Sequence, residues 1–198
     1  MTIIEPKYRL LLLANLIALV GFSAYYIMRG NLEFMVYVSV VAFFLVLIYG
    51  TRNRVDYPIG VLWALSGWAF FHMLGGSLFI GETRLYDFIF VPIVGEPYHI
   101  LKFDQLIHAY GFGVCTFVAY HLAKPVLKPE VRGKVGLAIV LAMAGLGAGA
   151  LNEIVEFTVT VFSPSSGIGG YVNNSLDLVA NATGAVIAAT WLYFKADV

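Results

Sequence analysis

The sequence predicts an all-α membrane protein, a polytopic bundle of six transmembrane helices that forms a single transmembrane domain over residues 1–198. The first observation is composition: 60% of the residues are hydrophobic and only 12% are charged, whereas a soluble domain has about 45–50% apolar and roughly 25% charged residues. The second is that six apolar stretches approach the about 20 residues that a spanning helix needs.

The six predicted helices follow one another from the N-terminus. Lys7 and Arg9 precede the first, which is longer than the apolar part of a signal peptide and lacks a clear cleavage site, so we expect a retained helix. The second is short and the fifth is long, which indicates tilt or a turn outside the membrane. The predicted helices are Leu10–Met28, Phe34–Tyr49, Ile59–Ile80, Asp104–Ala123, Val135–Phe162 and Ser175–Phe194.

The placement of lysine and arginine predicts the orientation, because these residues are enriched on the cytoplasmic side. Three fall on one side of the predicted bundle, at Arg29, Arg84 and Lys102. Both termini are therefore expected in the cytoplasm, with the loops 81–103 and 163–174 outside. The nine on the other side are Lys7, Arg9, Arg52, Arg54, Lys124, Lys128, Arg132, Lys134 and Lys195.

Several function classes are disfavoured. The formal net charge is zero, so nothing points to nucleic acid. The single cysteine, Cys115, excludes an intrachain disulfide and a paired-cysteine metal or redox motif. No lysine lies deep in a predicted helix, which argues against a retinal-type Schiff base.

The run Phe88–Val91 in the outer loop is too short to span and suggests a re-entrant or interfacial piece.

An eight-residue pattern occurs twice, each time at the start of a predicted helix. Asp104, His108 and Gly111 belong to D-x-x-x-H-A-x-G, and Asp177, Asn181 and Gly184 belong to D-x-x-x-N-A-x-G. Ionisable side chains within membrane helices are costly, so each marks a candidate functional site. The repeat predicts one site that is built from two related helices.

Other polar residues fall at a similar depth. At about 1.5 Å of rise per residue, His108 lies about 6 Å below the outer boundary and His72 about 12 Å below it. On the same scale Glu156 lies near ~9 Å, Glu153 near ~14 Å, and Asn181 at roughly 9–12 Å. Four helices therefore bring polar groups into the outer half of a hydrocarbon core about 30 Å thick.

Carboxylates that lie this close need cations, protons or water to balance their charge. Three explanations stay open: a divalent metal ion, carboxylates that share protons, or a wet cavity. A hydrogen-bonded network that only fixes the helix register is an equally weighted alternative. For a metal ion the candidate ligands are Asp104, His108, Glu153, Glu156 and Asp177.

Some polar residues carry less weight. For Tyr86, Asp87, Glu96 and His99 in the outer loop, we expect solvent exposure, and the alternative is that they line the mouth of the site. Asn152 is a possible network member beside Glu153. The run 173–175 matches a glycosylation sequon, which is common by chance.

On these motifs the chain resembles the VanZ-like family and the related YjdF-type family of small prokaryotic membrane proteins. The resemblance covers residues 104–184 and rests on D-x-x-x-H at Asp104/His108, E-x-x-E at Glu153/Glu156, and the Asp177 motif. VanZ-like proteins usually have glutamine where Glu156 stands and an arginine in the following loop, so this chain is closer to the YjdF-type pattern. The resemblance implies a polytopic protein of the cytoplasmic (inner) membrane. VanZ-like members are linked to low-level glycopeptide resistance.

The favoured function is an enzyme that acts from the outer side on a lipid or amphiphilic substrate, by metal-assisted or acid–base chemistry. The alternatives are a proton-coupled transporter, an accessory subunit whose cluster is structural, and a haem protein with two histidine ligands. Membrane lipids are the expected partners, and the oligomeric state stays open. The candidate catalytic residues are His72, Asp104, His108, Glu153, Glu156, Asp177 and Asn181.

Overall fold

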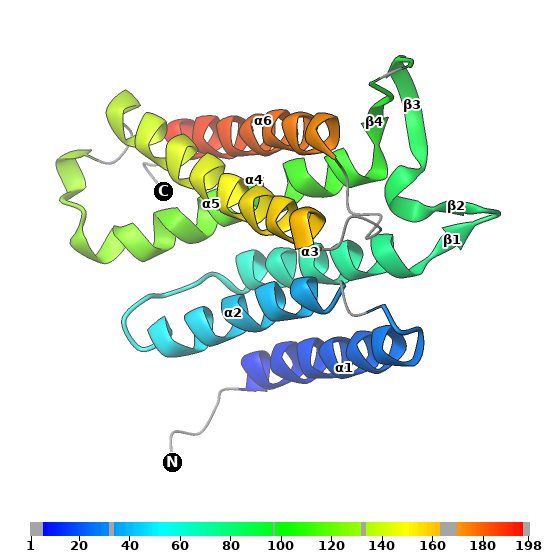
Figure 1. Ribbon diagram of the computed structural model, residues 1–198. Coiled ribbons are helices and arrows are strands. Elements are labelled where there is room, and N and C mark those ends of the chain that lie inside the picture. Colours follow the sequence, from blue (N-terminus) through cyan, green and yellow to red (C-terminus); the bar gives the residue numbers. More distant parts are fainter. Residues whose placement is uncertain (1–5, 32–33, 97, 132–133, 163–169, 196–198) are drawn as a thin grey trace.

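The computed structural model describes residues 6–31, 34–96, 98–131, 134–162 and 170–195, and helices dominate it (Figure 1). Two small antiparallel hairpins connect α3 to α4. The first pairs β1 (Phe79–Ile80) with β2 (Thr83–Arg84), and the second pairs β3 (Ile89–Val94) with β4 (Ile100–Lys102). The α-helices in the described ranges are α1 (Pro6–Met28), α2 (Met35–Thr51), α3 (Ile59–Ser77), α4 (Phe103–Ala123), α5 (Val135–Phe162) and α6 (Tyr171–Lys195).

Helix length and composition support an integral membrane bundle. Of the described helices, five are long and apolar enough to cross a membrane, namely α1, α3, α4, α5 and α6. The sixth, α2, has 17 residues and is about 26 Å long at 1.5 Å per residue. It falls short of the hydrocarbon core, which is about 30 Å thick. By length and composition the structure therefore supports five of the six predicted spans and leaves α2 unsupported.

Three helix boundaries differ by three or more residues from those predicted, and the first is that of α1, which begins at Pro6 rather than at Leu10. α3 ends at Ser77 rather than at Ile80, because Leu78 is extended and Gly81, at φ +63°, makes the turn between β1 and β2. α6 begins at Tyr171, four residues before the predicted start at Ser175. The outer-loop run Phe88–Val91 is neither helical nor buried, since most of it lies in β3 of the second hairpin.

α4 and α6 lie side by side and run parallel, with the most extensive contact in the molecule (Figure 1). A glycine allows this close approach: a Cβ at Gly184 would lie 1.8 Å from the carbonyl oxygen of Ala109. α5 crosses the same pair through a GxxxG spacing, with Gly145 against Thr116 and Gly149 against Asn181. These contacts hold the polar starts of α4 and α6 against the end of α5.

Aromatic side chains of the first half of the chain form a wall beside this bundle. Phe34, Tyr37 and Trp68 are buried in the core cluster with Tyr86. Three short 3₁₀ helices lie between the longer elements of the described ranges, at η2 (Leu85–Asp87), η3 (Lys124–Val126) and η4 (Pro129–Val131). Of these, η2 packs against α3 and places Tyr86 among the aromatic side chains of this wall.

Candidate functional site

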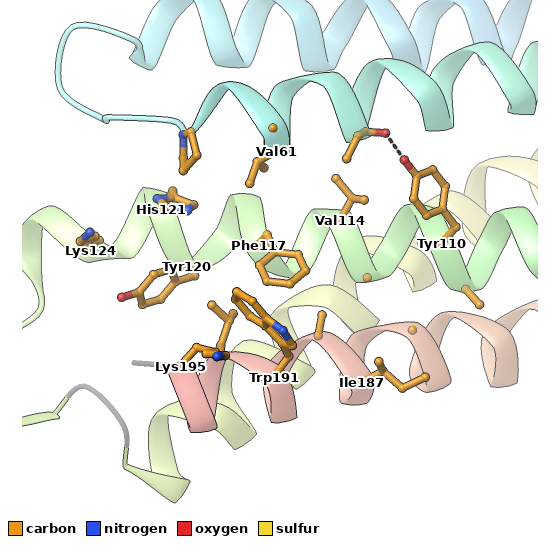
Figure 2. Close-up of a pocket in the computed structure, with 18 residues that line it drawn as sticks. Val61, Tyr110, Val114, Phe117, Tyr120, His121, Lys124, Ile187, Trp191 and Lys195 are labelled. Carbon is orange, nitrogen blue, oxygen red and sulfur yellow. Dashed lines mark hydrogen bonds between the residues drawn. The ribbon is translucent and has the colours of Figure 1, made fainter. Parts of the chain in front are cut away.

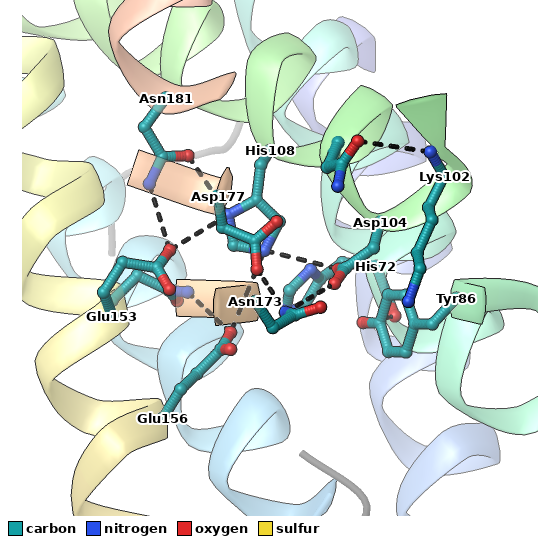
Figure 3. A network of polar contacts seen from close by, with 12 residues as sticks. His72, Tyr86, Lys102, Asp104, His108, Glu153, Glu156, Asn173, Asp177 and Asn181 are labelled. Atoms are coloured by element: carbon teal, nitrogen blue, oxygen red, sulfur yellow. Dashed lines mark hydrogen bonds and ion pairs between the residues drawn. The ribbon is translucent and has the colours of Figure 1, made fainter. Parts of the chain in front are cut away.

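Six predicted site residues meet between α4, α5 and α6 (Figure 3). All except Asp104 are buried, and the Asp104 side chain is 14% exposed. Within each helix the pairs share a face, since Asp104/His108 and Asp177/Asn181 are four apart and Glu153/Glu156 are three apart. The glycine contacts between the helices bring these faces together. We call this set the polar cluster; it consists of Asp104, His108, Glu153, Glu156, Asp177 and Asn181.

His108 is the centre of the polar cluster and is 1% exposed. Its Nδ1 lies 3.1 Å from Oδ1 of Asn181 and 3.1 Å from Oε1 of Glu153. Both of these oxygens can only accept, so Nδ1 is the protonated nitrogen. Asn181 also donates from Nδ2 to the same Glu153 oxygen at 3.0 Å, which fixes the amide and the imidazole together.

The second nitrogen of His108 faces carboxylates without bonding to them. Nε2 lies 3.5 Å from Oδ1 of Asp104 and 3.9 Å from Oε1 of Glu156. It has no hydrogen-bond partner among the residues that the structure describes. These separations are longer than a normal N–H···O bond of about 2.9–3.0 Å, so Nε2 is left open beside two carboxylates.

Asparagines hold the carboxylates at the rim of the polar cluster. Asn173 donates from Nδ2 to Asp104 at 3.1 Å and also to Oδ2 of Asp177, which ties the starts of α4 and α6 together. Asn152 donates to Glu156 at 2.8 Å, so its expected place in the network is confirmed. Asn174 donates to Glu153 at 3.2 Å. Each amide therefore supports one or two carboxylates.

Asp177 retains an unused oxygen. The residue is fully buried, and its Oδ1 has no hydrogen-bond partner in the described part of the chain. A buried polar atom without a partner is costly, so it calls for a ligand or water that completes it. Together with His108 Nε2, this gives the polar cluster two open ligand positions.

His72 lies beside the polar cluster rather than in its hydrogen-bond network. It is 2% exposed, and its ring centre is 6.0 Å from that of His108. The Tyr37 and Trp68 rings pack on it at 4.4 and 5.5 Å. Neither ring nitrogen of His72 has a partner among the described residues. It therefore lies next to His108 with both ring nitrogens open, outside the hydrogen-bond network of the polar cluster.

Tyr86 differs most from its expected role, because the sequence suggested solvent exposure and the structure buries it. Its hydroxyl donates to the carbonyl oxygen of His72. Burial raises the pKa of the Tyr86 phenol well above its usual value, and the nearby charges of Asp104 and Glu156 raise it further. The phenol therefore stays protonated, and its hydrogen bond holds the turn of α3 that contains His72.

The other outer-loop residues stay away from the polar cluster. Asp87 is exposed and pairs with Lys102 at 3.2 Å. Glu96 is exposed and His99 half-buried. α4 starts beside them, where Gln105 accepts from the backbone N–H groups of Leu101 and Lys102 and caps the helix.

Sequence reasoning missed Asn173 and Asn174, which the sequon pattern placed in an outer loop. The structure puts both in the first turn of α6. The spacing of Asn173 and Asp177, four residues apart, was the available signal, since it matches the spacing of Asp177 and Asn181.

Two groups of side chains have the geometry of metal ligands. One atom each from Asp104, His108 and Asp177 lies within 4.8 Å of the other two, and the same holds for Glu153, Glu156 and Asp177. Ligand atoms that bind one ion at about 2.0–2.2 Å lie no more than about 4.4 Å apart, so a contraction of a few tenths of an ångström closes either group. Asp177 belongs to both.

Comparison with known proteins identifies a family but no activity. A family model described as "Predicted membrane protein (DUF2238)" matches residues 8–197. No curated protein and no solved structure matches the chain.

Proposed function

The chain belongs to the DUF2238 family of predicted membrane proteins, and we propose that it is a divalent-metal-dependent hydrolase that acts on the polar end of an amphiphilic substrate. The metal ligands would come from Asp104, His108, Glu153, Glu156 and Asp177. One observation carries the proposal: Nε2 of His108 has no hydrogen-bond partner among the described residues, yet it faces two carboxylate oxygens at 3.5 and 3.9 Å.

The donor set fits a metal such as zinc, manganese or iron. Carboxylate oxygens with one imidazole nitrogen are typical ligands of these ions. The Nδ1–H of His108 donates to Glu153 and Asn181, which orients the ring and leaves the lone pair of Nε2 available to a metal ion. Because Asp177 belongs to both ligand groups, it is the residue that would join two neighbouring ion positions.

Charge balance supports the same proposal. When ionised, the four carboxylates of the polar cluster carry four negative charges, and His108 offers at most one positive charge. Four buried like charges repel one another strongly in a medium of low dielectric constant. A divalent cation would offset two of them and also complete the open oxygen of Asp177.

The residues around the ion positions have separate tasks. A bound divalent ion would lower the pKa of a bound water and so supply the nucleophile. Asn181 and Glu153 hold His108, and Asn173 holds Asp104 against Asp177. His72 is the acid–base candidate, because its ring is 6.0 Å from His108 and both nitrogens are open.

We also propose that the protein lies in the cytoplasmic membrane of a prokaryote with six spans, α2 included, and with both termini inside. The distribution of lysine and arginine supports this orientation, and it puts the starts of α4 and α6 on the outer side. Asp104, the most exposed member of the polar cluster, is then the point of entry for the polar end of a substrate.

Elemental analysis of the purified protein, prepared without chelators, tests the metal. We expect stoichiometric metal in the wild type and loss of metal in Asp177→Asn. The asparagine keeps an acceptor for Asn173, so this variant should fold. The control variant Glu130→Gln, which changes an exposed acid in η4 outside the polar cluster, should keep the metal. A metal-free wild type would overturn the proposal.

The reaction needs its own test. Membrane lipid extract is incubated with the metal-loaded protein and with the Asp177→Asn variant, and the products are compared by mass spectrometry. We expect hydrolysis products only from the wild type. Metal binding without any product would leave a metal site but contradict the hydrolase.

A structural network is the second candidate, and the amides favour it. Asn152, Asn173, Asn174 and Asn181 each donate to a carboxylate, which is how a cluster that fixes helix register would be built. On this alternative Glu153→Ala would destabilise the fold strongly and no metal would be found in the wild type.

A further inference from the structure

An apolar groove lies at the opposite end of the same helices (Figure 2). It has a volume of about 1080 Å³ and runs between the first half of α3 and the later parts of α4 and α6. Ala109 and Gly184, whose backbones touch, are at its end nearest the polar cluster. The helix contact thus separates the groove from His108 and Asn181, which face the other way.

The basic side chains of the groove are concentrated at one end. Lys124 and Lys195 lie there with His121, as Figure 2 shows. No acidic side chain lines the groove in the part of the chain that the structure describes. Between the basic end and Tyr110 the walls are apolar, and the aromatic pair Phe117 and Trp191 packs edge to face at 5.4 Å. The apolar wall residues are Val61, Ala64, Val114, Phe117, Ile187 and Trp191.

The groove is long enough for an acyl chain of the inner leaflet. Along α4, Tyr110 and Lys124 are about 21 Å apart at 1.5 Å per residue. Half of a hydrocarbon core is about 15 Å thick, so the groove extends from Lys124, near the inner boundary, to a point beyond the midplane. A lysine with a long apolar stem can extend its ammonium group to the level of the headgroups.

We propose that this groove binds an anionic phospholipid. One acyl chain lies along Phe117 and Trp191, and the phosphate sits between the ammonium groups of Lys124 and Lys195. Charge complementarity selects the headgroup, since two lysines and no acid line that end. The exposed Asp56 is close enough to His121 to interact with its charge, but it stands outside the lining. The apolar walls select a chain rather than a free phosphate, because a soluble anion would leave them uncovered.

Tryptophan quenching by brominated lipid tests the proposal, because bromine on an acyl chain quenches only at contact. The full protein is placed in nanodiscs of zwitterionic phosphatidylcholine with a minor fraction of phosphatidylglycerol. Bromine is carried either by the phosphatidylglycerol or by an equal fraction of the phosphatidylcholine. The signal of Trp191 is the difference between the wild type and Trp191→Phe.

We expect brominated phosphatidylglycerol to quench Trp191 preferentially. Two lysines at about 1 kcal/mol each correspond to a preference of up to about thirtyfold over phosphatidylcholine. The double variant Lys124→Gln/Lys195→Gln should lose the preference. The matched variant Lys128→Gln/Lys134→Gln, which changes two exposed lysines outside the groove, should keep it.

Other outcomes overturn the proposal. Equal quenching by both brominated lipids would mean an ordinary lipid-facing surface. A preference that both double variants lose alike would mean attraction by the basic side as a whole, and not binding between Lys124 and Lys195. A preference that inorganic phosphate abolishes while Trp191 quenching by phosphatidylcholine is unchanged would assign the basic end to a free anion.

Discussion

The polar cluster and the apolar groove are formed by the same two helices, yet they have opposite chemistry. At the starts of α4 and α6, acids and amides face α5 and are bonded to one another. At the far ends, apolar and basic side chains line the groove. The difference shows that one tight helix pair can carry a buried anionic site at one end and an open cationic one at the other.

The repeated motif explains how the two regions stay apart. Its Asp and its His or Asn, at the first and fifth positions, enter the polar cluster. Its small residues serve packing: Ala109 of the first copy touches Gly184 of the second, and Gly111 contacts Trp68 of α3. The two copies are therefore not equivalent by symmetry, because each glycine meets a different helix.

The largest effect is expected where the two regions join. In Gly184→Leu, the Cβ would lie 1.8 Å from the carbonyl oxygen of Ala109, against a backbone that cannot yield. We expect a loss of more than about 3 kcal/mol in the free energy of unfolding, or no folded protein, as overpacking typically costs about 1–3 kcal/mol even when side chains can move. Size-exclusion chromatography and denaturation in detergent measure it.

Gly147→Leu on α5 is the matched control. A Cβ at Gly147 meets nothing within 4 Å, and the residue is exposed. Its free energy of unfolding should stay within about 0.5 kcal/mol of the wild type. A well-folded Gly184→Leu variant with normal stability would show that the α4–α6 contact does not hold the two regions.

The next effect separates a metal site from a structural network. If the polar cluster binds a divalent ion, adding that ion at about one hundred times its Kd should raise the free energy of unfolding of the wild type by about 2.7 kcal/mol. Asp177→Asn should show no such increase, and Glu130→Gln should show all of it. Thermal unfolding with and without the metal is the measurement. An equal increase in the Asp177 variant would place the ion elsewhere.

The variant His72→Phe tests whether His72 is a metal ligand or lies outside the metal site. The imidazole is held by aromatic rings and has no hydrogen-bond partner among the described residues, so a phenyl ring should fit at a cost of less than about 1.5 kcal/mol. We expect full metal content with hydrolysis abolished. If elemental analysis instead finds that the metal is lost, His72 is a ligand and the polar cluster extends to α3.

The sequence predicts the helices and the residues of the polar cluster, but it predicts neither the burial of Tyr86 beside the polar cluster nor the apolar groove. The motif spacing and the depth of Glu153 and Glu156 are local properties, so periodicity and helix order predict polar faces at a similar depth, while the glycine contacts decide that these faces meet. Tyr86 could not be placed, since its burial depends on how η2 packs against α3. The groove was also beyond sequence reasoning, because Ile187 and Trp191 have the same pattern there as on any lipid-facing surface.

The smallest predicted effect compares two tyrosines at opposite ends of α3. Tyr57 precedes the helix and bonds to Thr51 at 2.8 Å, and Tyr86 follows it. Burial raises the pKa of both phenols above the usual 10.0, but for Tyr86 the charges of Asp104 and Glu156 add to the effect, whereas the Thr51 bond opposes it for Tyr57. Each Tyr→Phe variant should lose about 1 kcal/mol of stability at neutral pH.

Above pH 10 the two variants should diverge. A tyrosine whose folded pKa is raised stabilises the fold below the unfolded pKa of about 10, and this contribution is lost as the pH rises toward the folded value. The wild type should therefore lose stability above pH 10, by at most about 1.4 kcal/mol per pH unit for each such group. Denaturation between pH 9 and 11 measures the slope. Tyr86→Phe should flatten it more than Tyr57→Phe does, because burial and the charges of the polar cluster raise the pKa of Tyr86 well above 10, whereas the Thr51 bond limits the shift of Tyr57. Equal slopes in the two variants would contradict the larger shift of Tyr86.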